Sequence, residues 1–127
     1  MRDVSHSGAR PDLDRLLADG AFARTAAESI QALAAPSRLR ILARLHDGPA
    51  AVGEIAEGVG MEASAVSHQL RLLRHLGLVI GVRDGRRVVY ELHDDHVAEL
   101  LEQVVAHVEH VRLGLSGRER AGDAAAA

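Results

Sequence analysis

Apolar residues recur along most of this chain at the three- and four-residue spacing of amphipathic helices. The clearest stretch covers residues 61–78, where Val66 and Leu70 belong to one apolar face and polar side chains cover the other. A shorter stretch of the same period, residues 52–59, precedes it and ends at Gly60. Two helices joined by a short turn that contains glycine make a helix-turn-helix, whose second helix enters a DNA groove.

The same spacing predicts helices on both sides of this pair. Residues 22–34 and a segment from Pro36 to Leu45 are expected to be helices, separated at Ala35 because the residue before a proline avoids the α region. The last and longest helix is expected over residues 94–115. A terminal helix this apolar either covers the core or pairs with a copy of itself, and we interpret it as the dimer helix. Its apolar stripe consists of Leu100, Leu101, Val104, Val105, Val108 and Val111.

Two segments, residues 78–82 and 87–92, are rich in the β-branched residues that favour strands. The Arg-Asp-Gly-Arg sequence of residues 83–86 lies between them, and an Asp-Gly pair is the strongest short signal for a hairpin. A hairpin after a helix-turn-helix is a wing. The predicted fold class is therefore mainly α with a two-stranded β wing: a winged helix-turn-helix that is homodimeric through its terminal helices.

The chain is expected to form one domain with two flexible ends. Residues 1–20 are interpreted as a flexible N-terminal arm, residues 21–116 as the DNA-binding and dimerisation domain, and the low-complexity residues 117–127 as a disordered tail. No apolar run approaches the ~18 residues of a membrane span, and no charged-then-apolar leader opens the chain. We therefore expect a cytoplasmic protein with no membrane partner.

Charge is divided unevenly along the chain, although its net value is only −3. Residues 62–90 contain five arginines and two acidic residues, whereas residues 91–112 contain six acidic residues and one arginine. This division indicates one surface for a polyanion and another for a cation or a partner helix. Cysteine is absent, which excludes disulfides, thiolate metal sites and cysteine catalysis.

The polar face of the 61–78 helix and the tip of the hairpin carry the candidate DNA contacts. Short hydroxyls, amides and guanidiniums are the groups that bond phosphates and base edges. An ordinary surface helix and a solvated turn are the plainer alternatives, but arginines beside a recognition helix favour phosphate contact. The candidates are Ser64, Ser67, His68, Gln69, Arg71, Arg83, Arg86 and Arg87.

A second group of candidates lies on the last helix: Asp94, His96, His107 and His110. The three histidines share one face of this helix, along the edge of the apolar stripe. The eleven residues from His96 to His107 span roughly 16 Å, so one ion cannot bridge them within a chain. An antiparallel partner helix would bring Asp94 and His96 of one protomer beside His107 and His110 of the other, twice by symmetry.

Asp94 and His96 are two residues apart and would diverge on a regular helix. They converge only if Asp94 is the N-cap, where the backbone is not yet helical. The plainer alternative is a set of solvated or capping histidines. His46 is expected near a helix C-terminus and His75 on a surface, without a ligand role.

The run from Ala34-Ala35-Pro36-Ser37-Arg38 through Ser64-Ala65-Val66-Ser67-His68-Gln69-Leu70 to Gly85-Arg86-Arg87 closely resembles the ArsR/SmtB family of metal-responsive winged-helix repressors. The resemblance covers about residues 22–115, and the pattern of Asp94, His96, His107 and His110 is similar to the family's interprotomer metal site.

A histidine at position 110, followed by Leu113-Gly114-Leu115, is most similar to the nickel- and cobalt-sensing branch. Zinc-sensing relatives more often have a carboxylate at that position. The nickel-sensing relatives also place a histidine directly after their first residues, whereas the nearest histidine here is His6. His93 is the other candidate for an extra ligand. The resemblance therefore implies Ni(II) or Co(II) and keeps Zn(II) open.

The expected function is a homodimeric repressor that binds a two-fold symmetric double-stranded operator and responds to Ni(II) or Co(II). The alternatives are a zinc-responsive repressor of the same fold and a winged-helix repressor controlled by a protein partner. A hydrolytic enzyme is rejected because the chain has no His-Glu-x-x-His and no carboxylate evidently placed as a general base. A pure dimerisation module would leave the polar recognition face and the hairpin arginines unexplained.

Overall fold

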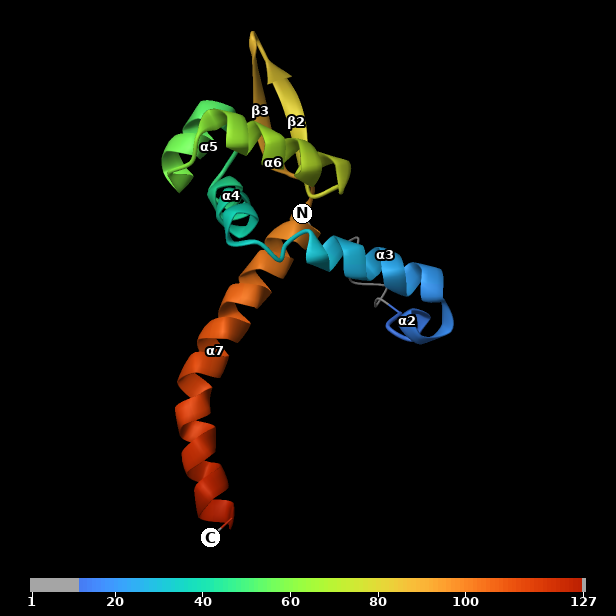
Figure 1. The fold of residues 1–127 in the computed structure, drawn as a ribbon, viewed down its shortest axis with the longest axis vertical. Coiled ribbons are helices and arrows are strands. Elements are labelled where there is room, and N and C mark those ends of the chain that lie inside the picture. Colours follow the sequence, from blue (N-terminus) through green and yellow to red (C-terminus); the bar gives the residue numbers. More distant parts are fainter. Residues whose placement is uncertain (1–11, 127) are drawn as a thin grey trace.

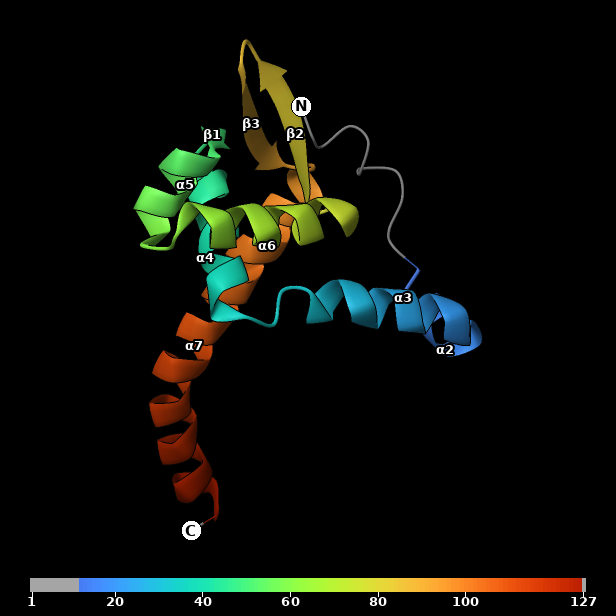
Figure 2. The ribbon, with the colours of Figure 1, turned by 45° about the horizontal axis from the view of Figure 1, so that its top comes forward.

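The computed structural model describes the backbone of residues 12–126 and the side chains of residues 12–114. Along this part of the chain, α4, α5, α6 and a small sheet cluster together, whereas α3 and α7 extend away from them in different directions (Figures 1 and 2). The helices are α2 (Arg15–Ala18), α3 (Gly20–Gln31), α4 (Pro36–His46), α5 (Val52–Val59), α6 (Ala63–His75) and α7 (Asp95–Ala126). The strands are β1 (Ala50–Ala51), β2 (Val79–Asp84) and β3 (Arg87–Leu92).

Helices α5 and α6 form the predicted helix-turn-helix, packed against α4. Their apolar faces meet in a core whose fully buried members include Leu42 on α4, Ile55 on α5 and Leu70 on α6. Gly60 ends α5 with a left-handed φ of 68°, a conformation that glycine adopts without strain, and so lets the chain reverse into α6. Burying each of these large apolar side chains stabilises the fold by about 1.5–3 kcal/mol.

The end of α6 directs the chain into the wing. Gly77 has a φ of 75°, and its N–H donates to the Arg74 carbonyl at 3.0 Å while the Leu78 N–H donates to the Leu73 carbonyl at 2.9 Å. This pair of bonds is a Schellman motif, which satisfies the last carbonyls of the helix. Gly77 therefore closes the recognition helix.

Strands β2 and β3 form the antiparallel wing, with Asp84 opposite Arg87. The two-residue turn is therefore Gly85-Arg86, and only Gly85 has a positive φ (67°), the sign pattern of a type II′ turn. The sequence predicts two strands, but the sheet has a third, because β1 pairs with β3 in the order β1-β3-β2. Two alanines carry neither the β-branched composition nor the alternation that identifies a strand, so β1 has no signal in the sequence.

Helix α7 packs against α4 and β3, and its buried residues, Val97 and Leu101, lie near its start. The sequence predicts that this helix ends near Leu115 and is followed by a disordered tail over residues 117–127, whereas α7 continues to Ala126. This last part of the chain has no proline and is rich in alanine, the strongest helix former, which offsets the roughly 1 kcal/mol that each glycine costs.

The N-terminal end of the described chain is helical as well. Of the arm expected over residues 1–20, the first eleven residues, and with them His6, lie outside the described residues. The remainder forms α2 and the start of α3, where the Asp19 carboxylate accepts hydrogen bonds from the Ala21 and Phe22 N–H groups. A side-chain oxygen at this position is the usual N-cap. None of the helices described for residues 12–126 is long and apolar enough to span a bilayer.

Candidate DNA-binding surface and metal-ligand cluster

Three of the predicted DNA contacts, Ser64, His68 and Arg71, lie on the exposed side of α6. At about 100° per residue, this side is opposite the face buried through Val66 and Leu70. Two hydroxyl- or imidazole-bearing side chains and a guanidinium therefore face outward along the recognition helix. Ser67 is half-buried and lines a small pocket between α6 and β3.

Gln69 is turned toward α4 rather than outward. Its Oε1 accepts a hydrogen bond of 2.9 Å from Nε of Arg38, whose Nη1 also donates to the Ala32 carbonyl at 3.1 Å. A guanidinium only donates, so the Gln69 amide must present its oxygen to Arg38. Arg38 thus joins the recognition helix to the end of α3. No local pattern in the sequence predicts this role of Arg38, because Arg38 and Gln69 are 31 positions apart.

The three wing arginines are exposed, but they differ in their partners. Arg87 Nη2 lies 3.5 Å from Oε1 of Glu54 on α5, and the same carboxylate oxygen accepts the Ala51 N–H at 2.9 Å. The Ala51 N–H, which outweighs desolvation, and the guanidiniums of Arg87 and Arg44 hold the pKa of Glu54 below its ordinary value. Within residues 12–114, no carboxylate is within ion-pair distance of Arg83 or Arg86, the other wing cations.

Asp94 occupies the N-cap of α7, as predicted, and gathers two imidazoles. Its Oδ1 accepts the Val97 N–H at 3.2 Å, the N-cap hydrogen bond. Its Oδ2 is 3.1 Å from Nδ1 of His93, and its Oδ1 is 3.5 Å from Nδ1 of His96. Burial raises the pKa of Asp94, but hydrogen bonds from His93, Val97 and His96 outweigh it and leave the pKa below its ordinary value. The carboxylate is therefore ionised, as a metal ligand must be.

This geometry suits a divalent metal ion. Oxygen and nitrogen donors bind such ions at about 2.0–2.2 Å, which places two ligands of a tetrahedral site roughly 3.4 Å apart. The 3.5 Å between Asp94 and His96 matches that separation. His107 and His110 lie farther along α7, three residues apart and exposed. Among the residues that the structure describes, no group of three or more potential ligands could hold an ion, so one chain does not complete a site there.

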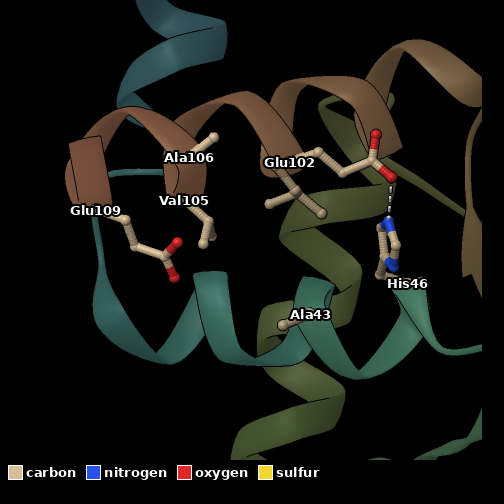
Figure 3. A pocket seen from close by; sticks show the side chains of 7 residues that line it. Ala43, His46, Glu102, Val105, Ala106 and Glu109 are labelled. Atoms are coloured by element: carbon tan, nitrogen blue, oxygen red, sulfur yellow. Dashed lines mark hydrogen bonds and ion pairs between the residues drawn. The ribbon is translucent and has the colours of Figure 1, made fainter.

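A groove lies between α4 and α7 (Figure 3). Nε2 of His46, the last residue of α4, is 2.9 Å from Oε2 of Glu102 on α7, and this contact closes one end of the groove. Ala43, Leu101, Val105 and Ala106 supply the apolar lining of a space of about 390 Å³. The apolar stripe of α7 continues past the groove and stays exposed, with Val108 49% accessible.

A helix-turn-helix with a polar recognition face, followed by a hairpin tipped with arginines, defines a winged helix-turn-helix DNA-binding protein. Residues 35–80 match the family described as "Bacterial regulatory protein, arsR family". The chain is 57% identical over 100 residues to the HTH-type transcriptional regulator NmtR of Mycobacterium tuberculosis, which covers 79% of this chain and 83% of the relative. The chain belongs to the ArsR family, whose matched members are transcriptional regulators rather than enzymes.

Further similarities agree with this assignment. A transcriptional repressor, the SmtB homolog of Synechocystis sp., is 44% identical over 87 residues, covering 68% of this chain and 66% of the relative. The solution structure of apo-NmtR superposes with a TM-score of 0.66 at 51% identity, covering 84% of this chain and 86% of that one. A homodimeric winged helix-turn-helix DNA-binding domain from Mycobacterium bovis gives a TM-score of 0.68 at 31% identity, covering 81% and 91%. The predicted winged helix-turn-helix fold, mainly α with a β wing, is confirmed.

Proposed function

We propose that this protein is a homodimeric, metal-responsive transcriptional repressor that acts in the cytoplasm on a two-fold symmetric operator. Each dimer would bind two Ni(II) or Co(II) ions, each held by Asp94 and His96 of one protomer with His107 and His110 of the other. The observation that carries this proposal is the approach of Asp94 Oδ1 to His96 Nδ1, 3.5 Å apart at the start of α7. These two groups are half of the proposed set of four metal ligands. They lie at the start of a helix whose apolar stripe is exposed.

The exposed stripe of α7 supports the dimer. Val104, Val105, Val108 and Val111 are between 37% and 56% accessible, and a stripe of this length on a small domain is typical of a surface that another chain buries. An antiparallel arrangement of two α7 helices would cover both stripes and bring the two halves of each ligand set together. The homodimeric state of the related Mycobacterium bovis domain agrees with this proposal.

DNA binding is assigned to the surface shared by α6 and the wing. Ser64 and His68 would enter the major groove, Arg71 would reach the DNA backbone or a base edge, and Arg83 and Arg86 would contact flanking phosphates. A two-fold dimer places two recognition helices about 34 Å apart, one turn of B-DNA. Metal changes DNA affinity only if it prefers one arrangement of the two protomers over another. By resemblance to the family, we expect metal to weaken operator binding.

Zn(II) is the second candidate, and the ligand set itself favours it. One carboxylate and three imidazoles complete the tetrahedral set that zinc prefers. A six-coordinate nickel site needs two more donors, and His93, 3.1 Å from the Asp94 carboxylate, is the nearest one that the structure describes. Absorption spectra of the Co(II) and Ni(II) forms distinguish four-coordinate from six-coordinate binding, because the coordination number sets the energies and intensities of the d–d bands.

The decisive experiment is a metal titration of the dimer and of mixed dimers. Two ions per dimer are expected, with none retained tightly by an Asp94→Ala, His96→Ala variant or by a His107→Ala, His110→Ala variant. A mixed dimer of the two variants should regain one site, because one of its two sites keeps all four ligands. His75→Ala, which removes an exposed histidine from α6, is the control and should bind like the wild type. Tight binding by either double variant alone would contradict the interprotomer site.

The same variants test regulation. His107→Ala should bind operator DNA like the metal-free wild type and should not respond to metal. Linkage requires that operator DNA lowers the affinity for metal by the same factor by which metal lowers the affinity for operator DNA. This factor typically corresponds to a coupling free energy of about 1–3 kcal/mol. Wild-type operator affinity that stays constant from the metal-free to the metal-saturated state would contradict the sensor function and leave a plain repressor.

A further inference from the structure

A small pocket lies between the recognition helix and the wing. It is lined by Ser67, Leu70, Arg71 and Arg74 of α6 and by Tyr90 of β3, and its volume is about 90 Å³. Leu70 is fully buried and forms the apolar side of the pocket, while the other four residues carry hydroxyl or guanidinium groups. At about 30 Å³ per water, the space holds about three waters or one group of comparable bulk.

The geometry of α6 and of the sheet brings the side chains that line this pocket close together. Ser67, Arg71 and Arg74 are at positions i, i+4 and i+7 of α6 and therefore form one row along the helix. Tyr90 lies in the central strand of the sheet, directly opposite Gly81 of β2. A Cβ atom at Gly81 would lie 3.3 Å from the Tyr90 ring, so the missing side chain leaves room for the ring beside α6.

The electrostatics of the pocket favour an anion. Arg71 and Arg74 are like charges three positions apart on one helix face, an arrangement that destabilises a helix when no counter-charge is present. No carboxylate lines the pocket, and within residues 12–114 neither guanidinium has an acidic side chain within ion-pair distance. Two guanidiniums and two hydroxyls together offer several donors, and guanidinium pairs well with phosphate oxygens.

We propose that this pocket binds one phosphate of the DNA backbone, which makes Arg74 and Tyr90 DNA-binding residues beside Arg71 and Ser67. This inference rests on the proposed DNA binding and specifies how the duplex is held. The phosphate joins α6 to β3, so it fixes the depth and register of the recognition helix in the groove without reading sequence. DNA is favoured over a free anion because the pocket opens between the two elements, α6 and the wing, that present the remaining DNA candidates.

The test uses the full-length protein and a duplex that it selects from a random library. Arg74→Gln should weaken binding to this duplex and to a scrambled duplex alike, and should lower the slope of log affinity against log salt by about one. Tyr90→Phe removes a single hydroxyl and should weaken both duplexes several-fold without changing their ratio. Arg24→Gln, on the remote helix α3, is the matched control and should leave slope and affinity unchanged.

Single methylphosphonate linkages, which are uncharged, then locate the phosphate. One linkage in each half-site should weaken binding of the wild type but not of the Arg74→Gln, Tyr90→Phe double variant. If the double variant responds to every neutral linkage as the wild type does, the phosphate does not occupy this pocket. A wild type that selects no duplex above its non-specific affinity contradicts the proposed function itself, which separates the two failures.

Tyr90 is the single tyrosine of a chain without tryptophan, so its ring resonances report on the pocket alone. The selected duplex should shift these resonances in the wild type and shift them less in Arg74→Gln. A shift with inorganic phosphate but none with the duplex would assign the pocket to a free anion and overturn the proposal.

Discussion

The DNA-reading half and the sensor half of this molecule differ in how much of their structure one chain provides. In the first half, α4, α5 and α6 bury their apolar faces against one another, and the wing is held by β1 and by Glu54. In the second half, α7 leaves most of its apolar stripe exposed and carries the proposed ligands in two separate parts, one at its start and one near its middle. One chain therefore builds a complete reader, whereas the proposed metal site would need a second chain to complete it.

This difference has a regulatory consequence. Under the proposed function, a ligand that acts at the incomplete half would change how two complete readers are placed relative to each other and would leave each reader intact. Binding to a two-fold operator, which needs both readers at one spacing, would then respond to such a change even if no residue of α6 moves within its own chain.

The largest effect should follow from damage to the complete half. Leu70→Ala removes a fully buried side chain of α6 and should lower the free energy of unfolding by about 2–5 kcal/mol. Leu113→Ala, at a position 80% accessible on α7, should change it by less than about 0.5 kcal/mol. Urea unfolding followed by circular dichroism measures both values, and similar losses in the two variants would show that the halves are equally self-contained.

The incomplete half should respond in its association rather than in its folding. Val104→Glu places a charge in the exposed stripe and should raise the dissociation constant of the dimer about 100-fold or more, because a charge would be buried on each side of the interface. Leu113→Glu is the control, since position 113 lies about 180° from position 104 around the helix. Sedimentation velocity distinguishes the two outcomes. A Val104→Glu protein that remains dimeric would place the interface elsewhere.

Arg38 tests how the DNA-reading half is joined to α3, because it bonds both the end of α3 and the recognition helix. Arg38→Ala removes two hydrogen bonds from charged donors and should lower the free energy of unfolding by about 1–3 kcal/mol. Operator affinity should fall as well, while metal affinity stays unchanged. Arg40→Ala, which removes an exposed arginine of the same helix, is the matched control. Equal losses of unfolding free energy and operator affinity in both variants would show that the hydrogen bonds of Arg38 contribute to neither.

The smallest effect should separate two neighbouring wing arginines. Arg86→Ala should lower the salt slope of DNA binding by about one, as expected for the loss of one phosphate contact. Arg87→Ala should lower it less, since Glu54 already lies 3.5 Å from its guanidinium. Fluorescence anisotropy at several salt concentrations gives both slopes. A larger change in salt slope for Arg87→Ala than for Arg86→Ala, or altered sequence specificity at constant slope, would contradict the proposed phosphate contact by the wing.

Sequence reasoning works here where the signal is local. The apolar period of α6 and the composition of β2 and β3 each depend on residues within a few positions, and both predictions are confirmed. Asp94 at the N-cap of α7 belongs to the same group, because a carboxylate before a helical period is a local signal as well.

The remainder depends on contacts between distant residues or between chains. Strand β1 exists because two alanines lie beside β3, and the Gln69 amide is engaged because Arg38 comes close from α4. Tyr90 lines a pocket with α6 only because the sheet places it there. The metal-ligand set of Asp94, His96, His107 and His110 stays a prediction, since its two halves would meet only between two chains.

The pairing of β1 with β3 also bears on how such regulators diversify. Ala51 lies opposite Val89, so residues 51–89, which include α5, α6 and most of the hairpin, leave and re-enter the rest of the fold at adjacent points. A segment with neighbouring ends is the kind of unit that proteins exchange without disturbing their surroundings. Under the proposed function, new operators could therefore be acquired by substitution inside this segment, while α7, outside it, would keep the proposed metal ligands.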